Sequence, residues 1–171
     1  MAKFEDAIEF VLKNEGGLVD DPNDPGGITA WGISLRFYKT IKAKVTANDI
    51  KRLTKDEAKN IYENHFWNRN KYYALNSQKI ATKAFDMSVN CGVRASNQAL
   101  QKAVMHSSKC ILRVDGILGD KTIAAVNSAN EQDVYQSFKS FQRDYYLDVL
   151  KRFPELAKYK NGWLKRASSD V

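Results

Sequence analysis

The sequence has no long hydrophobic run, and its 171 residues include only two cysteines, two histidines and three prolines. A membrane-spanning helix needs about 18 or more consecutive apolar residues, so we expect no stable insertion into a membrane. Cys91 and Cys110 have no second cysteine pair to complete a zinc site. For a chain made in the cytoplasm, two buried free thiols are expected rather than a disulfide. The sequence therefore predicts no bound metal and no cofactor.

The chain also lacks internal repeats, low-complexity segments and a convincing linker. Hydrophobic residues make up 43% and charged residues 27% of the sequence, as in an ordinary globular protein. The length is sufficient for one compact domain with its own core, and we expect a monomer. Residues 1–6 are acidic and amphipathic, so they do not resemble a secretory signal peptide. We therefore expect a single domain, residues 1–171, made in the cytoplasm without a signal peptide.

The net charge of +7 is unevenly distributed along the chain. Residues 1–33 carry 2 basic and 7 acidic side chains, whereas residues 34–80 carry 11 basic and 4 acidic ones. Most basic residues stand singly, and no clustered recognition helix is present, which argues against nucleic acid as a partner. A solvated surface is the simplest explanation of the basic body. Attraction to anionic polymers of a bacterial envelope is equally compatible with it.

The most informative feature is an acidic residue that continues an apolar stripe. Phe4, Ile8, Val11 and Leu12 recur with the spacing of one helix face, and the next position of that stripe is Glu15. A Gly-Gly pair follows and should end the helix. Burial and the negative end of the helix dipole both disfavour a carboxylate, so we predict a raised pKa for Glu15. Such a group can serve as a general acid; the alternative is an exposed Glu at a helix end.

The following segment is rich in glycine and proline and carries three further carboxylates. Asp24 stands nine residues after Glu15, and Thr29 lies five residues further on, in a segment (28–33) predicted to form a short strand, half of a small hairpin. A Glu at a helix end, followed by an Asp and a Thr in this setting, resembles the phage-type lysozymes. The wider string from Glu15-Gly16-Gly17 to Gly32-Ile33 more closely resembles the N-acetylmuramidases of glycoside hydrolase family 108. That family includes phage endolysins and proteins once called secretion activators.

The resemblance implies a mainly α fold, a lysozyme-like helical domain with a small β-hairpin beside the active-site cleft. It implies hydrolysis of the β-1,4 bond between N-acetylmuramic acid and N-acetylglucosamine in bacterial peptidoglycan. Glu15 would be the acid, Asp24 the second carboxylate and Thr29 a residue that holds water. Asp20 and Asp21 are reserve candidates for the second carboxylate. Alternatives are a lytic transglycosylase and a non-catalytic protein that binds the cell wall.

Further substrate contacts are expected at four positions. Trp31 lies on the predicted strand, and Tyr62 lies on the inner face of a helix that begins after a capping box at Thr54. Asn90 belongs to Val89-Asn90-Cys91-Gly92, which resembles the helix end that faces the substrate cleft in the family; a helix C-cap is the other possibility. Gln101 precedes a segment, 114–122, that resembles a peptidoglycan-binding sequence. These resemblances predict a catalytic portion, 1–92, and a helical portion, 93–171.

The remaining helices follow from periodicity and capping residues. Residues 80–91 are apolar on more than one face, which predicts the central buried helix. Ser96 and Asp120 are expected to cap the two helices after it. A long helix should end before Pro154, and Trp163 should lock the last helix onto the core.

A calcium site could use Asp20, Asp21, Asn23 and Asp24, but the EF-hand pattern would place a glycine at its twelfth position, where a glutamate is required. His65 has no other ligand at metal-binding spacing and is expected to pack in the core or at the edge of the cleft. Without a signal peptide, an endolysin would reach the wall through a holin or through an export accessory.

Overall fold

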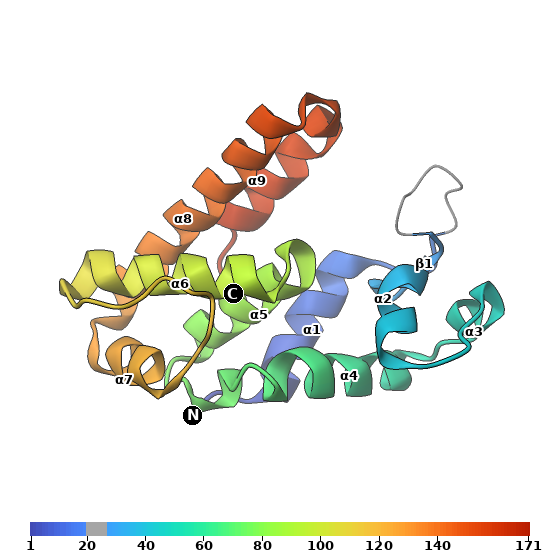
Figure 1. The fold of residues 1–171 in the computed structure, drawn as a ribbon, viewed down its shortest axis with the longest axis horizontal. Coiled ribbons are helices and arrows are strands. Elements are labelled where there is room, and N and C mark those ends of the chain that lie inside the picture. Colours follow the sequence, from blue (N-terminus) through green and yellow to red (C-terminus); the bar gives the residue numbers. More distant parts are fainter. Residues whose placement is uncertain (20–26) are drawn as a thin grey trace.

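The computed structural model describes residues 1–19 and 27–171 and shows a mainly helical chain with one small β-hairpin (Figure 1). Asp20, Asp21 and Asp24, for which catalytic roles are predicted, lie outside the described residues. In chain order the elements are α1 (Phe4–Glu15), β1 (Thr29–Ala30), β2 (Ile33–Ser34), α2 (Leu35–Ile41), α3 (Ala47–Lys51), α4 (Lys55–Tyr62), a π-helix (Glu63–Asn68), a 3-10 turn (Tyr72–Ala74), α5 (Gln78–Cys91), α6 (Val93–Ser108), α7 (Asp120–Ser128), α8 (Glu131–Arg152), a 3-10 segment (Pro154–Tyr159) and α9 (Lys160–Ser168).

Helix α1 buries the predicted apolar stripe. Its residues Phe4, Ile8, Val11 and Leu12 are all buried, and the helix packs against α5. Gly16 follows α1 with a φ of 72°, in the left-handed region that glycine adopts without strain. Glu15 is therefore the last residue of the helix, as the sequence predicts, and its side chain leaves from the buried side.

The short strand predicted over residues 28–33 is in fact most of a complete hairpin. Thr29 pairs with Ser34 and Ala30 with Ile33, in antiparallel register. The two residues between the strands, Trp31 and Gly32, both have positive φ, 53° and 78°. Positive φ at both central positions defines the tight turn that suits the twist of two paired strands. The prediction of half a hairpin was wrong because the turn lies inside the segment.

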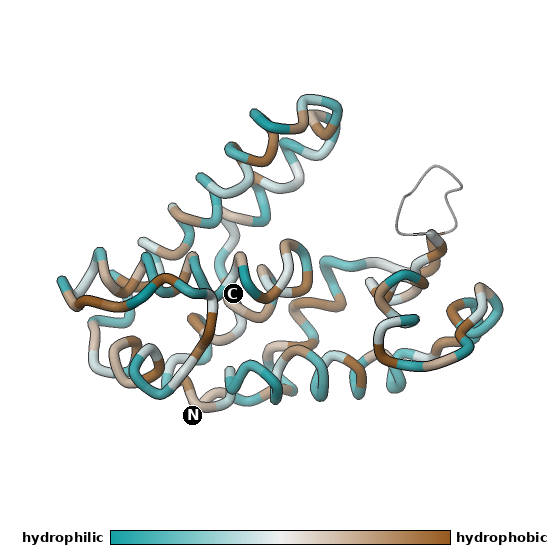
Figure 2. Tube along the Cα trace, viewed as in Figure 1, coloured by the Kyte–Doolittle hydropathy of each residue, from teal (hydrophilic) through white to brown (hydrophobic). Residues whose placement is uncertain are grey.

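Helix α5 is the central helix, as predicted. Nine consecutive residues, Ile80–Ser88, are buried, because α1, α6 and α8 pack around it. The rings of four aromatic residues surround Phe85 at centroid distances of 5.5 to 6.3 Å; they are Phe4, Tyr62, Trp67 and Tyr72. Figure 2 shows hydrophobic and hydrophilic residues alternating along helices such as α1 and α4.

Two predicted caps are wrong. Helix α6 begins at Val93, so Ser96 lies inside it, fully buried, and its hydroxyl donates to the carbonyl of Ala84 in α5 at 2.6 Å. Asp120 is the first residue of α7 and makes no capping hydrogen bond there. The cap at Thr54 is confirmed, since its hydroxyl accepts from the backbone N–H of Glu57 at 3.2 Å.

Helices α8 and α9 form an antiparallel pair that projects from the rest of the chain (Figure 1). Pro154 follows the end of α8, as predicted. Trp163 of α9 stacks on Tyr146 of α8 with ring centroids 5.2 Å apart, so its main contact is with α8. Cys91 and Cys110 are free thiols, but both are half-buried rather than buried as predicted. None of the described helices is both long and apolar enough to cross a membrane.

Candidate active site

The centre of the candidate site is the carboxyl group of Glu15. Its side chain is 16% exposed, although it stands at a helix end. Gly32 of the hairpin turn approaches it so closely that a Cβ there would lie 2.8 Å from Cγ of Glu15 and would collide with the hydroxyl of Tyr62. A residue without a side chain is therefore required at this turn. The hairpin turn thus packs directly against the side chain of Glu15.

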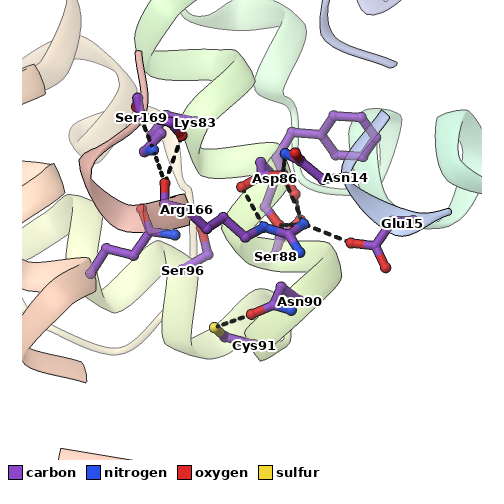
Figure 3. Close-up of polar contacts among 12 residues, drawn as sticks. Asn14, Glu15, Lys83, Asp86, Ser88, Asn90, Cys91, Ser96, Arg166 and Ser169 are labelled. Atoms are coloured by element: carbon purple, nitrogen blue, oxygen red, sulfur yellow. Dashed lines mark hydrogen bonds and ion pairs between the residues drawn. The ribbon is translucent and has the colours of Figure 1, made fainter. Parts of the chain in front are cut away.

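Arg166 of α9 holds the Glu15 carboxylate. Its Nη2 donates to Oε1 of Glu15 at 2.6 Å and to Oδ1 of Asp86 at 2.8 Å. Its Nε donates to Oδ2 of Asp86 at 2.9 Å, so the ion pair with that carboxylate is bidentate. Figure 3 shows the guanidinium between the two acids. One buried cation thus joins α1, α5 and α9.

Two further residues fix this arrangement. Asp86 is fully buried and also accepts a hydrogen bond from Nδ2 of Asn14 at 3.1 Å. Lys83, one helical turn before Asp86 on α5, is also fully buried, and its Nζ donates to the carbonyls of Arg166 (2.6 Å) and Ser169 (2.9 Å). A cation at a helix C-terminus satisfies carbonyls that have no partner within the helix. Residues of α5 therefore bind both the side chain and the main chain of Arg166.

The pKa of Glu15 is raised, as the sequence predicts. Burial is the main cause, and the negative charge of Asp86 adds to it, whereas Arg166 acts in the opposite direction. The sequence pattern predicted the burial but not the cation. A carboxylic acid that keeps its proton to a higher pH, yet stays oriented by Arg166, is suited to protonating a leaving oxygen.

Tyr62 and Trp31 lie beside this acid, but both are used by the fold. The Tyr62 hydroxyl donates to the carbonyl of Trp31 at 2.9 Å, and Tyr62 is only 1% exposed. Burial and the negative charge of Glu15 both raise the pKa of Tyr62. The indole N–H of Trp31 donates to the carbonyl of Leu53 at 2.9 Å. Together they fix the turn against Glu15, and their contacts with substrate stay predictions.

The other predicted residues form hydrogen bonds with other parts of the fold. Thr29 is half-buried in β1, where its hydroxyl donates to the carbonyl of Gly27 at 3.2 Å. Asn90 is exposed at the end of α5, and its side-chain oxygen accepts from the Tyr146 hydroxyl at 2.9 Å. Gln101 is buried elsewhere, in α6, and its side chain holds the turn at residues 115–117. The structure therefore brings Gln101 to that turn and not to Glu15.

The sequence reasoning missed the residues that surround Glu15, namely Asn14, Lys83, Asp86 and Arg166. Asp86 could have been predicted as Glu15 was, because it is also a carboxylate at a position where the helix pattern is apolar. Arg166 is the last residue of the string Gly-Trp-Leu-Lys-Arg, in which the sequence predicts a role for Trp163 alone. Its partners lie 80 and 151 residues earlier in the chain, beyond the reach of any periodic pattern.

Within the part of the chain that the structure describes, no three His, Cys, Asp or Glu side chains gather to hold a metal ion. His65 packs edge-on against Phe37, with ring centroids 6.5 Å apart. The residues of the alternative calcium site, from Asp20 to Asp24, lie outside the described ranges. In the described site, the buried acid Glu15 lies beside the cation of Arg166.

Comparison with known proteins gives two adjacent family matches. The model of the Glycosyl hydrolase 108 family matches residues 8–92, and that of the Predicted Peptidoglycan domain matches residues 95–168. A comparison with curated proteins gave no match. Among solved structures, that of Brucella abortus SagA is 30% identical, with a TM-score of 0.81, over 96% of this chain and 89% of that one.

These similarities confirm the mainly α, lysozyme-like fold with its small hairpin. They also support glycoside hydrolase activity, with peptidoglycan as the substrate. The buried Glu15 lies within the first matched segment, and Arg166 lies within the second. The chain belongs to glycosyl hydrolase family 108.

Proposed function

We propose that this protein is an N-acetylmuramidase, which hydrolyses the β-1,4 bond between N-acetylmuramic acid and N-acetylglucosamine. The observation that carries the proposal is the buried Glu15 carboxyl, with its raised pKa, held by Arg166 at 2.6 Å. The family membership supplies the reaction class, since glycoside hydrolases commonly use one protonated and one ionised carboxyl group.

In the proposed reaction, Glu15 donates its proton to the glycosidic oxygen as the bond from that oxygen to the anomeric carbon breaks. Positive charge then develops on the sugar ring, and water forms the new bond to the anomeric carbon. Asp24 is proposed to accept the proton of this water or to stabilise the positive charge, and Thr29 to hold the water. Asp20 and Asp21 are the alternatives for the second carboxylate.

The proposed biological role is that of a phage or prophage endolysin for host lysis. The chain would be made in the host cytoplasm and would reach the cell wall through a holin-type pore; export by an accessory is the alternative route. The net charge of the whole chain, +7, would favour attraction to anionic envelope polymers. We propose that it acts as a monomer.

The test compares the wild type with Glu15→Gln on purified peptidoglycan. The variant keeps the shape of the side chain but has no proton to donate, so we expect the rate of clearing to fall about 100- to 10,000-fold. Glu5→Gln is the matched control, because Glu5 is exposed in the first turn of the same helix. Clearing by Glu15→Gln at the wild-type rate would rule out the proposed acid.

Mass spectrometry of the released fragments tests the bond and the reaction type. Fragments with reducing muramic acid ends are expected for hydrolysis of the proposed bond. Anhydro-muramic ends would identify a lytic transglycosylase instead, and the absence of soluble fragments would indicate a non-catalytic wall-binding protein.

A further inference from the structure

The outer end of the α8–α9 pair takes no part in the buried site around Glu15. It consists of residues 151–160, which comprise the last two residues of α8, Phe153, the 3-10 segment and the first residue of α9. We refer to these ten residues as the tip. Figure 1 shows the tip at the end of the pair that points away from the other helices. Nine of its ten residues are exposed, and only Leu156 is half-buried.

Three apolar side chains follow one edge of the tip. A 3-10 helix has three residues per turn, so side chains three positions apart lie above one another. Phe153, Leu156 and Tyr159 have this spacing, and the backbone N–H of Leu156 donates to the carbonyl of Phe153 at 3.1 Å, which closes the first turn. Phe153 is 48% exposed and Tyr159 45%. The ring of Phe153 contacts no other aromatic ring among the described residues. A contiguous apolar edge that stays exposed in this way is typical of an interaction surface.

The charge around this apolar edge is positive. The tip contains four basic residues and one acidic residue, Glu155, which gives it a net charge of +3. The basic residues are Lys151, Arg152, Lys158 and Lys160. Lys151 lies 3.5 Å from Asp148, but both side chains are exposed, so this ion pair neutralises little of the charge. The other three cations form no ion pair with a described carboxylate.

We propose that the tip binds the surface of an anionic lipid bilayer. Phe153 and Leu156 would enter the boundary between the headgroups and the acyl chains, where apolar side chains of interfacial helices lie. Tyr159 would lie at the level of the headgroups, as aromatic rings with a polar group do. The cations would lie near the lipid phosphates, each strengthening binding about 5-fold. The contact is peripheral, since none of the described helices could cross a membrane.

The apolar edge favours a bilayer over a soluble anionic polymer. A polymer could pair with the cations, but it would leave Phe153 and Leu156 in water, whereas a bilayer accommodates both groups. Stacking on a sugar ring is also less suitable, because Tyr159 is already stacked on Trp163 with ring centroids 5.7 Å apart. Lys158 lies over the same tyrosine ring, 5.0 Å from its centroid. The position of the tip at the end of a projecting pair allows it to meet a flat surface (Figure 1).

Sedimentation of the full-length protein with lipid vesicles tests the proposal. One set of vesicles contains phosphatidylglycerol and phosphatidylcholine in equal amounts, and the other contains phosphatidylcholine alone. We expect binding to the neutral vesicles to be about 100-fold weaker, because three net charges each contribute about 5-fold. Inorganic polyphosphate, a soluble polyanion without an apolar phase, is the competitor.

Variants of the cations test which part of the chain binds. Lys158→Gln/Lys160→Gln should weaken binding to the anionic vesicles about 25-fold, by the loss of two charges. Lys102→Gln/Lys121→Gln removes the same charge from exposed positions of α6 and α7 and is the matched control. It should change binding less than about 2-fold, because its charges lie outside the proposed contact.

A variant of the apolar edge separates a bilayer from a polyanion. Phe153→Ser should weaken binding to the anionic vesicles about 3- to 10-fold, because half of the ring is available for burial, and should leave binding to polyphosphate unchanged. Ile111→Ser, at a residue that is 94% exposed elsewhere, should change neither. The unfolding temperature identifies a variant that is merely destabilised, and the exposed lysine pair then provides the second measurement.

Equal binding to the two kinds of vesicle, or wild-type binding by the lysine variant, would overturn the proposal. Wild-type binding by Phe153→Ser, with polyphosphate displacing the vesicles, would also overturn it and would identify a site for soluble polyanions. None of these results bears on Glu15, which the cleavage assay on purified peptidoglycan tests without any lipid.

Discussion

Replacement of Arg166 by methionine tests whether one cation serves both the stability of the fold and the orientation of Glu15. The change leaves the fully buried Asp86 carboxylate with Asn14 as its remaining side-chain partner. Removing one member of a buried ion pair costs about 3–5 kcal/mol, because the remaining charge stays buried without compensation. We therefore expect Arg166→Met to lower the free energy of unfolding by about this amount in urea at pH 7.

A second change separates the charge effect from the loss of packing. In the double variant Arg166→Met/Asp86→Asn, no buried carboxylate is left unpaired at position 86. The double variant should therefore be more stable than the sum of the two single changes predicts, by about 1–3 kcal/mol. Urea unfolding of the wild type and the three variants gives this coupling free energy directly. Strict additivity would refute the assignment of a buried, energetically coupled pair.

Activity should respond differently from stability. Both variants that lack Arg166 lose the cation that lowers the pKa of Glu15, so that pKa should rise further. The alkaline limb of the pH–rate profile should then move to higher pH, while kcat falls because the carboxyl is no longer oriented. Restoring stability through Asp86→Asn should not restore kcat. A wild-type pH profile in Arg166→Met would show that the guanidinium does not act on Glu15.

Three further results are expected. Burial lowers the pKa of Lys83 from 10.5 to about 8. Between these two pH values the unfolded chain therefore binds more protons than the folded chain, and the free energy of unfolding should rise with pH. Relative to Lys83→Met, the rise should be about 3 kcal/mol. Lys102→Met, at an exposed position, should show no such difference. Gly32→Ala should cost about 1–3 kcal/mol in thermal unfolding because its Cβ would meet Glu15, whereas Gly162→Ala has open space and should be neutral or stabilising. Glu15→Gln should be no less stable than the wild type at pH 7, because the raised pKa means that folding disfavours the charged form.

The sequence predicts those features of the site that depend on one helix. The stripe from Phe4 to Leu12 places Glu15 on the buried side of α1, because helix periodicity alone decides which face a residue occupies. The same argument could have identified Asp86 in the central helix. It could not have identified Arg166, whose contact with Glu15 depends on how α9 packs against residues far away in the sequence.

Polar side chains that bond to another element are equally hard to predict, as the wrong cap at Ser96 shows. Serine is a common helix cap, but the Ser96 hydroxyl instead donates a hydrogen bond to the carbonyl of Ala84 in the adjacent helix, inside the core. Gln101, whose contact with substrate stays a prediction, likewise uses its amide for the turn at residues 115–117. In both cases a polar side chain satisfies a partner from another element. Such a choice depends on tertiary packing, which local patterns do not record.

The position of Arg166 connects the two segments of the chain that match separate families. Glu15 and Asp86 belong to the segment that matches a glycoside hydrolase, whereas Arg166 belongs to the segment that matches a peptidoglycan domain. Without α9 and Ser169 after it, Asp86 would lose the guanidinium of Arg166, and Lys83 would lose the two carbonyls to which it donates. The second segment therefore supplies part of the environment of the proposed acid, so the hydrolytic chemistry and the packing of α9 depend on the same buried charges.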